Sequence, residues 1–443
     1  MSLPTANIPA AGQLEVARLG PCRVPSPLLR RREHFTSDSR ILVCRETAEL
    51  EPLVAAGSVP AFEAAGPRRE IFFEPEGLTC GIVTCGGLCP GLNDVIRSIF
   101  LTLRHGYGVR KVLGFRYGYS GLVREPRSAP IELDSALVES IHHKGGTLLG
   151  SSRGPQDLGE MVDQLERLGV SILFAIGGDG TLRGAHALAQ EIARRQLPIS
   201  IIGIPKTIDN DLMWTQRTFG FVTAVESAQS VIHAAHTEAR AVWHGVGLVK
   251  LMGRHAGFIA AHATLASGDV NFCLVPEVPF SLEGQGGLIE LLAARLQERR
   301  HAVVVVAEGA GQELVSDGSA GRDASGNRKL EDIGVFLRQR FRARFAELDI
   351  PINVKYIDPS YIIRGQPANS NDSSFCLMLG QHAVHAGMAG RSRMMVGFWN
   401  NNFIHVPLAL VADRSKTLDP GGETWQRVLE TTGQPASMVG SFP

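Results

Sequence analysis

The sequence predicts an α/β fold in which mostly parallel sheets are covered by helices on both faces. Short apolar runs alternate with segments whose apolar residues recur at helical spacing, and glycine-rich or charged turns follow several of the runs. Strands that alternate with helices are typical of parallel sheets buried on both sides. Because ligands collect at the carboxyl ends of such strands, those turns are where a functional site is expected.

The predicted strands are short continuous apolar runs bounded by turn residues, the pattern of buried strands. They are "ILVC" (41–44), "GLTCGIVTC" (77–85), "KVLGFR" (111–116), "VSILFAI" (170–176), "ISIIGIP" (199–205), "GVGLVKLMG" (245–253), "NFCLVPE" (271–277) and "HAVVVVAEG" (301–309). Residues 1 to about 35 are rich in proline and carry Arg30, Arg31 and Arg32, which predicts a loosely ordered, solvated extension. The segment 316–329 is a surface loop by composition.

Composition limits the class of protein. The chain has 443 residues and 44% hydrophobic content, enough for two or more domains. Its 44 basic and 44 acidic residues balance, so charge gives no argument for a nucleic-acid or membrane partner. Seven scattered cysteines favour a reducing compartment, and the amino terminus lacks the pattern of a secretory signal. No apolar run approaches the roughly 18 residues of a membrane helix, so we expect the cytoplasm.

The segment "LFAIGGDGTLRGAHALAQ" (173–190) places Asp179 in a glycine turn between a strand and a helix. Glycine leaves room for a ligand, and a helix N-terminus presents N–H groups to an anion. A carboxylate there would repel phosphate unless a cation such as Mg²⁺ joined the two. Taken alone, the motif is equally well read as an ordinary turn, since glycine motifs have many false positives.

Charged residues follow other predicted strands as well. They are Lys206, Thr207, Asp209 and Asp211 in "KTIDNDL", Arg254 in "MGRHAGF", Glu308, and Lys355, Tyr361 and Arg364 further on. Polar groups at many successive strand ends are costly unless they face a ligand. The alternatives are that Lys206 and Asp209 form a surface ion pair and that Cys85 and Cys89 are core residues rather than a metal pair. We assign no role to the histidines.

The sequence resembles the phosphofructokinase family over roughly residues 40 to 435. The motifs that carry the resemblance are "GGLCPGLNDVIR", "GGTLLGSSRG", "AIGGDGTLRGA", "GIPKTIDNDL", "LVKLMGRHAGF", "LVPE", "VVAEG" and "YIIRGQ". Their wording is similar to that of the plant-type and kinetoplastid ATP-dependent enzymes. The resemblance implies transfer of phosphate from Mg-ATP to the C1 hydroxyl of fructose 6-phosphate, the committed step of glycolysis.

The resemblance also implies roles for individual residues. Asp209 matches the catalytic base, with Thr207 and Ile208 beside it on the substrate, and Asp179 matches the carboxylate that holds Mg²⁺. The nucleotide positions are Gly86, Arg153, Gly154, Gly178, Asp179, Gly180 and Thr181, of which Arg153 would also stabilise charge on the transferring group. The sugar-phosphate positions are Met252, Gly253, Arg254, Glu308, Lys355, Tyr361 and Arg364. An arginine and a histidine of the short bacterial enzymes are replaced here by Gly245 and Tyr361.

Gly180 and Lys206 occupy the positions that distinguish phosphoryl donors in this family. Glycine at the first position is typical of ATP enzymes, and lysine at the second is common in pyrophosphate enzymes. An acidic side chain at position 180 would repel the α-phosphate of a nucleotide, whereas glycine leaves the space open. We therefore expect ATP, with pyrophosphate as the alternative donor. "GGDGT" also occurs in NAD kinases and lipid kinases, but those lack "PKTIDND" followed by "MGR". A catalytically silent sugar-phosphate sensor is a further alternative.

For architecture, the resemblance implies two doubly wound lobes with the active site in the cleft between them. The expected nucleotide lobe is 80–222 and 363–413, and the sugar-phosphate lobe is 223–362 and 414–443. Residues 1–79 are expected to form an N-terminal extension. The family further implies an allosteric homotetramer, or a homodimer.

Overall fold

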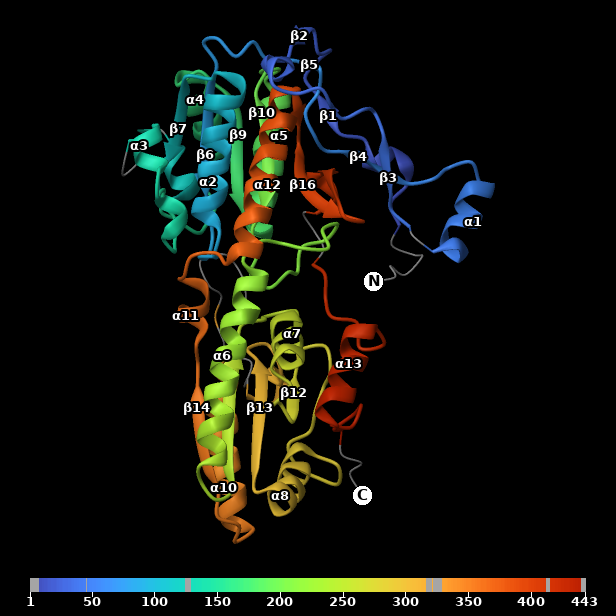
Figure 1. The fold of residues 1–443 in the computed structure, drawn as a ribbon, viewed down its shortest axis with the longest axis vertical. Helices are drawn as coiled ribbons and strands as arrows, with labels where there is room; N and C mark the ends of the chain where they lie inside the picture. Colours follow the sequence, from blue (N-terminus) through green and yellow to red (C-terminus); the bar gives the residue numbers. More distant parts are fainter. Residues whose placement is uncertain are drawn as a thin grey trace. The chain divides into compact units, whose positions relative to one another are not determined.

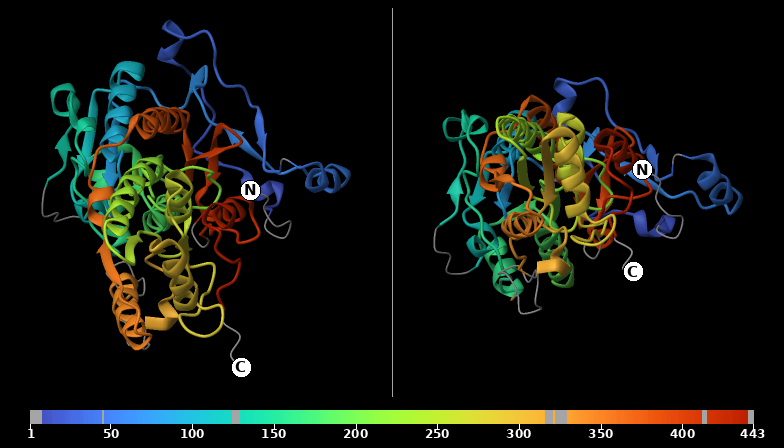
Figure 2. Two further views of the ribbon diagram at one scale, coloured as in Figure 1. Left: turned by 60° about the horizontal axis from the view of Figure 1, so that its bottom comes forward. Right: turned by 90° about the horizontal axis from the view of Figure 1, so that it is seen from below.

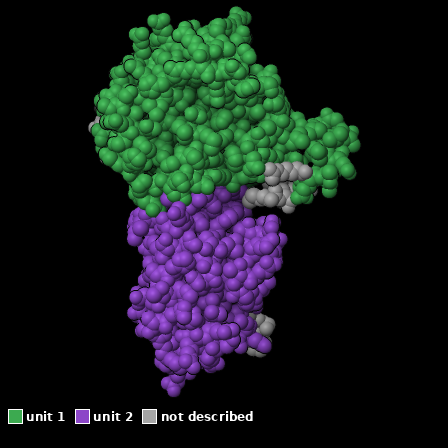
Figure 3. Space-filling model, in the orientation of Figure 1, with its two compact units in different colours: residues 1–208, 212–220, 365–415 green, residues 209–211, 221–364, 416–443 purple. Residues whose placement is uncertain are grey.

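The computed structural model describes residues 8–44, 46–123, 129–315, 321, 329–411 and 415–439. The chain forms two compact units (Figure 3). Unit 1 comprises 1–208, 212–220 and 365–415, and unit 2 comprises 209–211, 221–364 and 416–443. The family resemblance implied lobe boundaries after residues 222, 362 and 413. The boundaries between the observed units lie after Gly220, Arg364 and Ser415, and residues 209–211 also belong to unit 2. Apart from Gly321 and Lys329, the surface loop expected at 316–329 lies outside the described residues.

Unit 1 is built on a nine-stranded mixed sheet with the order β3-β4-β17-β16-β10-β9-β6-β7-β8. The inner strands β16, β10, β9, β6 and β7 are parallel to their neighbours in that run, and the outer pairings are antiparallel. The bounds are β3 Arg40–Leu42, β4 Ala61–Ala64, β6 Thr79–Thr84, β7 Lys111–Phe115, β8 Ile131–Glu132, β9 Val170–Gly177, β10 Ser200–Pro205, β16 Met394–Trp399 and β17 Asn402–Pro407.

Helices cover both faces of this sheet, as alternation along β9 requires. Leu173 and Ala175 belong to a buried cluster that includes the apolar faces of α4 (Leu158–Arg167) and α5 (Asp179–Arg194). On the other face, Ile172 and Phe174 lie against Gly387 of α12 (Ser370–Met388). α12 packs beside α2 (Leu92–Leu101), as Figure 1 shows. The predicted doubly wound, mostly parallel arrangement is confirmed.

The expectation of a loosely ordered extension is wrong for residues 8–35. Leu14 is fully buried in the core of unit 1, and β1 (Ala17–Arg18) pairs with β15 (Arg391–Ser392). β2 (Val24–Pro25) pairs in turn with β5 (Glu70–Ile71). The segment is ordered because it buries apolar side chains and pairs its backbone, although Arg30, Arg31 and Arg32 are exposed as expected.

Unit 2 contains a four-stranded parallel sheet with the order β12-β13-β11-β14. The bounds are β11 Gly245–Leu251, β12 Phe272–Leu274, β13 His301–Ala307 and β14 Asn353–Ile357. Val246 and Leu248 of β11 join a cluster with α8 (Leu288–Arg299) and α10 (Ile333–Glu347), whereas Gly247 faces Ala235 of α6 (Phe221–Arg240). Helices therefore cover both faces of this sheet too (Figure 2).

The remaining elements are short or lie at the margins. In unit 1 they are η2 Ala11–Leu14, η3 Pro27–Arg30, α1 Thr47–Ala55, η4 Thr102–Tyr107, η5 Gly118–Gly121, α3 Ser135–Val138, η6 Ile141–His143 and η7 Leu408–Leu410. In unit 2 they are α7 Phe258–Ser267, α9 Gln312–Val315, α11 Ser360–Arg364 and α13 Glu423–Thr432. Within the described ranges, no helix has the length and apolar character that crossing a membrane requires.

Candidate active site

The glycine turn of unit 1 lies where the sequence placed it, between a buried strand and a helix. β9 ends at Gly177 and α5 begins at Asp179, with Gly178 as the N-terminal cap. The carboxylate of Asp179 forms an ion pair with Arg183, one turn further along the helix. The first turn of α5 thus holds an acidic side chain next to the backbone N–H groups of a helix start.

The glycines of this turn differ in what surrounds them. A Cβ added at Gly177 would lie 2.2 Å from the Thr181 hydroxyl, so a side chain there is excluded by packing. Within 4 Å, a Cβ added at Gly180 would meet only the Nη2 atom of Arg183, at 3.8 Å. Position 180 therefore has open space on the side where a side chain would project, and the fold itself does not require glycine there.

A second group of predicted nucleotide residues comes together at the end of β6. Gly86 follows that strand with a φ of 86°, and its N–H donates to the carbonyl of Ser152 at 3.1 Å. The hydroxyl of Ser151 donates to the carbonyl of Gly86 at 2.5 Å. These bonds hold Arg153, whose side chain is exposed, and Gly154, whose φ is 99°, beside the Gly86 loop.

Lys206 lies in unit 1 directly after β10 and is buried, with 6% of its surface exposed. Its ammonium donates a hydrogen bond of 2.7 Å to the carbonyl of Gly87. A Cβ added at Gly86 would lie 3.5 Å from the same ammonium. Lys206 therefore holds the glycine loop that follows β6. Thr207 comes next and is half-buried, its carbonyl accepting from the hydroxyl of Thr218 at 2.8 Å, and Ile208 is buried.

The residues of this turn fit a magnesium ion bound together with phosphate. The Asp179 side chain is 36% exposed, although its Oδ1 atom is buried and Oδ2 pairs with Arg183. Mg²⁺ in nucleotide sites is commonly held by one or two carboxylates and otherwise by phosphate oxygens and water. Among the described residues, no group of three or more histidine, cysteine or acidic side chains is placed to hold a metal ion by itself.

Asp209 belongs to unit 2 and is half-buried. The residue after it, Asn210, has a φ of 54°, a conformation that asparagine tolerates better than most residues. Two residues after Asp209, the carbonyl of Asp211 accepts a hydrogen bond of 2.6 Å from the N–H of Lys416. The segment that carries Asp209 is thereby tied to the C-terminal part of unit 2.

Met252, Gly253 and Arg254 lie at the carboxyl end of β11, beside the end of β13 that carries Glu308. The N–H of Glu308 donates to the carbonyl of Leu251 at 2.9 Å, and that of Gly309 donates to Gly253 at 3.0 Å. Gly253 has a φ of 127°, where a side chain would be strained. The two strand ends are therefore joined, and the predicted sugar-binding residues on them lie together.

Burial and the neighbouring positive charges act on the pKa of Glu308 in opposite directions. Burial raises the pKa of its carboxyl group, while the positive charges of Arg254, Lys250 and Arg364 act in the opposite direction. A raised pKa from desolvation is common where a carboxylate faces a site for a polar ligand. Three cations therefore lie around one half-buried acid at this end of the sheet.

Tyr361 and Arg364 lie on α11, which follows β14. The guanidinium of Arg364 lies over the Tyr361 ring, 4.6 Å from its centroid, and the tyrosine is 78% exposed. Lys355 lies within β14, opposite Gly247 of β11, and not at the end of the strand. Two of the three predicted 6-phosphate residues therefore lie on one helix, and the third is set back in the sheet.

Four charged residues near these positions, Arg183, Lys250, Asp332 and Asp358, were not found from the sequence. Arg183 pairs with Asp179, and its spacing of four residues is the one signal that could have identified it. Lys250, on β11, forms ion pairs with Asp332 and Asp358. No local sequence pattern indicates these two ion pairs, because the partners are far apart in the chain.

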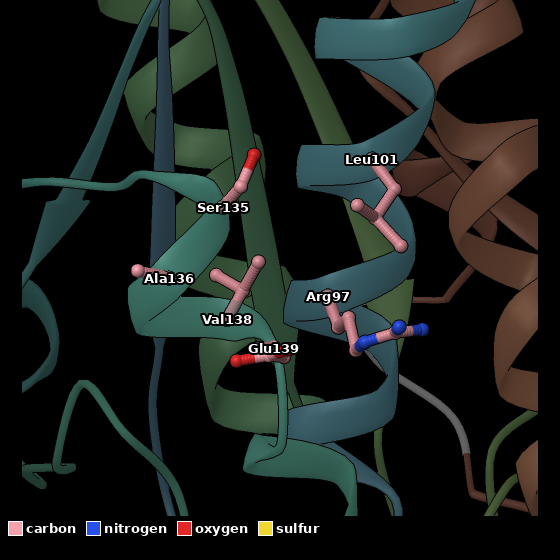
Figure 4. A pocket seen from close by; sticks show the side chains of 6 residues that line it. All are labelled: Arg97, Leu101, Ser135, Ala136, Val138 and Glu139. Carbon is pink, nitrogen blue, oxygen red and sulfur yellow. The ribbon is translucent and has the colours of Figure 1, made fainter.

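A pocket of about 300 Å³ lies elsewhere in unit 1 (Figure 4). It is lined by Arg97, Leu101, Ser135, Ala136, Val138 and Glu139. α2 supplies the first two of these residues and the segment around α3 supplies the rest. The set has no residue in common with the predicted site residues.

Comparisons with known proteins agree with these arrangements. The family model described as "Phosphofructokinase" matches residues 79–387. Curated relatives named ATP-dependent 6-phosphofructokinase include that of Trypanosoma brucei brucei, 52% identical over 84% of this chain and 76% of its own length. The relative from Borreliella burgdorferi is 49% identical over 85% of this chain and 86% of its own length. The one from Amycolatopsis methanolica is 47% identical over 96% of this chain and 95% of its own length.

Solved structures share the fold at lower identity. A pyrophosphate-dependent phosphofructokinase from Marinobacter aquaeolei has a TM-score of 0.67 and is 22% identical, covering 83% of this chain and 93% of that one. The phosphofructokinase of Pichia pastoris has a TM-score of 0.60 at 22% identity, over 84% of this chain and 37% of its own. The family match and the identity to relatives over most of their length lead to one conclusion: this chain belongs to the phosphofructokinase family.

Proposed function

We propose that the protein transfers the γ-phosphoryl group of ATP to the C1 hydroxyl of fructose 6-phosphate. The products are fructose 1,6-bisphosphate and ADP. The observation that carries ATP as the donor is the open space at Gly180, where an added Cβ meets only a flexible arginine terminus at 3.8 Å. The names of the relatives, which match this chain at 47–52% identity, support the same reaction.

On the donor side, the glycine turns of unit 1 bind the nucleotide. Gly86, Gly154, Gly178 and Gly180 let its phosphates approach the backbone, and Thr181 stands in the first turn of α5. The exposed guanidinium of Arg153 stabilises charge that develops on the transferring group. Asp179 holds Mg²⁺, which supplies neutralisation of phosphate charge when bound.

On the acceptor side, Asp209 takes the proton from the C1 hydroxyl as general base, with Thr207 and Ile208 beside it on the substrate. Met252, Gly253, Arg254 and Glu308 bind the sugar. Arg364 binds the 6-phosphate, for which a guanidinium is well suited, and Tyr361 and Lys355 contribute at the same end. Support comes from the hydrogen bonds that join the ends of β11 and β13 and from the cations around Glu308.

Pyrophosphate is the alternative donor, and Lys206 is the residue that favours it. The bond from its ammonium to the Gly87 carbonyl gives Lys206 a structural use that does not depend on the donor. Two solved neighbours are named pyrophosphate-dependent, but at 22% and 19% identity they bear on the fold alone. We further propose that the protein is cytoplasmic and forms an allosteric homotetramer or homodimer. Light scattering with and without substrates would test the oligomeric state.

The test is the initial rate with fructose 6-phosphate and Mg²⁺, with either ATP or pyrophosphate supplied to the same purified protein. We expect turnover with ATP and little with pyrophosphate. Turnover with pyrophosphate alone would contradict the donor assignment, and binding of the sugar phosphate without any bisphosphate product would indicate a silent sensor.

A further inference from the structure

Lys250 of β11 lies two residues before Met252, in unit 2, and forms ion pairs with two carboxylates. Its ammonium lies 2.9 Å from a carboxylate oxygen of Asp332 and 2.9 Å from one of Asp358. The lysine side chain is only 12% exposed. The partners' charges more than offset burial, so the pKa of Lys250 is raised and the side chain is charged throughout the neutral range.

Each of the two carboxylates uses its second oxygen to hold the start of a helix. Oδ1 of Asp358 accepts from the N–H of Ser360 at 3.1 Å and from its hydroxyl at 2.6 Å, at the point where α11 begins. Oδ1 of Asp332 accepts from the N–H of Val335 at 3.0 Å and from the hydroxyl of Tyr356 at 3.0 Å. Lys250 therefore connects β11 to the first turns of α10 and α11.

The consequence for α11 is specific, because this helix is short and carries both Tyr361 and Arg364. Ile363, between them in the sequence, is fully buried and anchors the helix. The pair of Asp358 with Lys250 also fixes the start of the helix. β11 ends at Leu251, directly after Lys250, and Met252 and Arg254 follow, so one ammonium group ties the end of this strand to the start of α11.

We propose that Lys250 is a positioning residue that fixes α11, and through it Arg364 and Tyr361, for the 6-phosphate end of the sugar substrate. The inference rests on the proposed function, since it assumes that α11 contacts a sugar phosphate. Lys250 does not act as a phosphate ligand itself, because its ammonium is already shared by two carboxylates and little of it is exposed. Its loss would leave two carboxylates without their cation close to the place where a dianion has to bind.

The variants that test this are Lys250→Met, which removes the charge at similar length, and Lys250→Arg, which keeps both ion pairs. For Lys250→Met we expect the KM for fructose 6-phosphate to rise roughly ten- to a hundredfold, while the KM for ATP changes by less than about threefold. Lys250→Arg should recover most of the loss. Asp358→Asn should follow Lys250→Met, and Asp332→Asn should have a smaller effect because it holds α10, which carries none of the proposed ligands.

Binding of fructose 6-phosphate by calorimetry gives a readout that does not require turnover, and thermal unfolding of each variant reports the fold. A purely structural role would lower the melting temperature and the amount of active enzyme while leaving the KM for the sugar phosphate as in wild type, and would overturn the inference. An equal rise in both KM values would overturn it as well. If the wild-type protein neither binds nor phosphorylates fructose 6-phosphate, the proposed function fails first and the inference with it. Wild-type turnover with an unaffected Lys250→Met variant refutes the inference alone.

Discussion

The ammonium of Lys206 lies 2.7 Å from the carbonyl oxygen of Gly87, and so joins the end of β10 to the glycine loop that follows β6. The lysine is 6% exposed and Gly87 is half-buried, so this hydrogen bond is partly shielded from water. A charged donor in such a place is strongly held by its acceptor. The residue that would suggest pyrophosphate as donor thus also shapes the loop proposed to bind ATP.

Lys206→Met should weaken nucleotide binding more than sugar binding. Without the ammonium, the Gly87 carbonyl loses a charged partner and the loop loosens, so we expect the KM for ATP to rise about tenfold or more. The KM for fructose 6-phosphate should change much less. Initial rates with each substrate varied in turn measure both values. Lys111→Met, at an exposed strand position, is the matched control and should behave as wild type.

Gly180→Asp should impair the use of ATP while leaving the fold intact. The added side chain has open space in the protein, but its charge would face the nucleotide phosphates, so kcat/KM with ATP should fall by at least about tenfold. Gly180→Ala adds the Cβ without the charge and separates the steric effect from repulsion. The measurement is kcat/KM with ATP and with pyrophosphate for both variants. An equal loss with the two donors in Gly180→Asp would contradict the argument.

Asp209→Asn should retain sugar binding and lose most turnover. A neutral amide cannot accept the hydroxyl proton, and loss of a general base typically costs about 10²- to 10⁴-fold in kcat. Calorimetry with fructose 6-phosphate checks that the site still forms, and steady-state kinetics gives kcat. Near-normal turnover would remove Asp209 from the role of base.

The strands and the glycine turn could be predicted because each is encoded locally. The run "VSILFAI" became β9, and Asp179 lies in the first turn of the helix that follows. The hairpin of β16 and β17 was not predicted, although both of its turn positions hold asparagine, Asn400 and Asn401, which tolerates the positive φ that such a turn requires. The pairs made by Lys250 could not be predicted, because they depend on which strand and helix ends become neighbours, and the one to Asp332 spans 82 residues.

Glu63 of β4 should prove important for stability, because it organises buried charge between the N-terminal segment and the sheet. One of its oxygens lies 2.8 Å from Arg391 and 3.2 Å from Arg68, and the other lies 3.2 Å from Arg18. Glu63→Gln leaves buried guanidinium groups without a counter-charge, at a cost of about 3–5 kcal/mol. Thermal unfolding at neutral pH should show a large drop in melting temperature. Glu51→Gln, on the exposed side of α1, should cause little change.

The pH dependence of stability should depend measurably on His382 of α12. Its ring stacks on Phe403 with 4.4 Å between centroids, and burial, with the charges of His405 and Arg32, lowers its pKa to about 4. Between pH 6.5 and about 4, the His382 ring is protonated in the unfolded chain but neutral in the folded protein. Stability must therefore fall as the pH falls through this window, by up to about 3 kcal/mol from this residue.

Replacing His382 by phenylalanine keeps an aromatic ring against Phe403 and removes the titrating group. Within the described structure, Nδ1 of His382 has no hydrogen-bond partner, so this substitution gives up no bond at that atom. The difference in melting temperature between pH 7.5 and pH 5 should be smaller for His382→Phe than for wild type. The same substitution at the exposed His34 should leave that difference as it is in wild type. If both variants kept the full pH dependence, the loss of stability at low pH would have to come from other groups, of which buried His385 and His405, whose pKa values are also lowered, are the next to test.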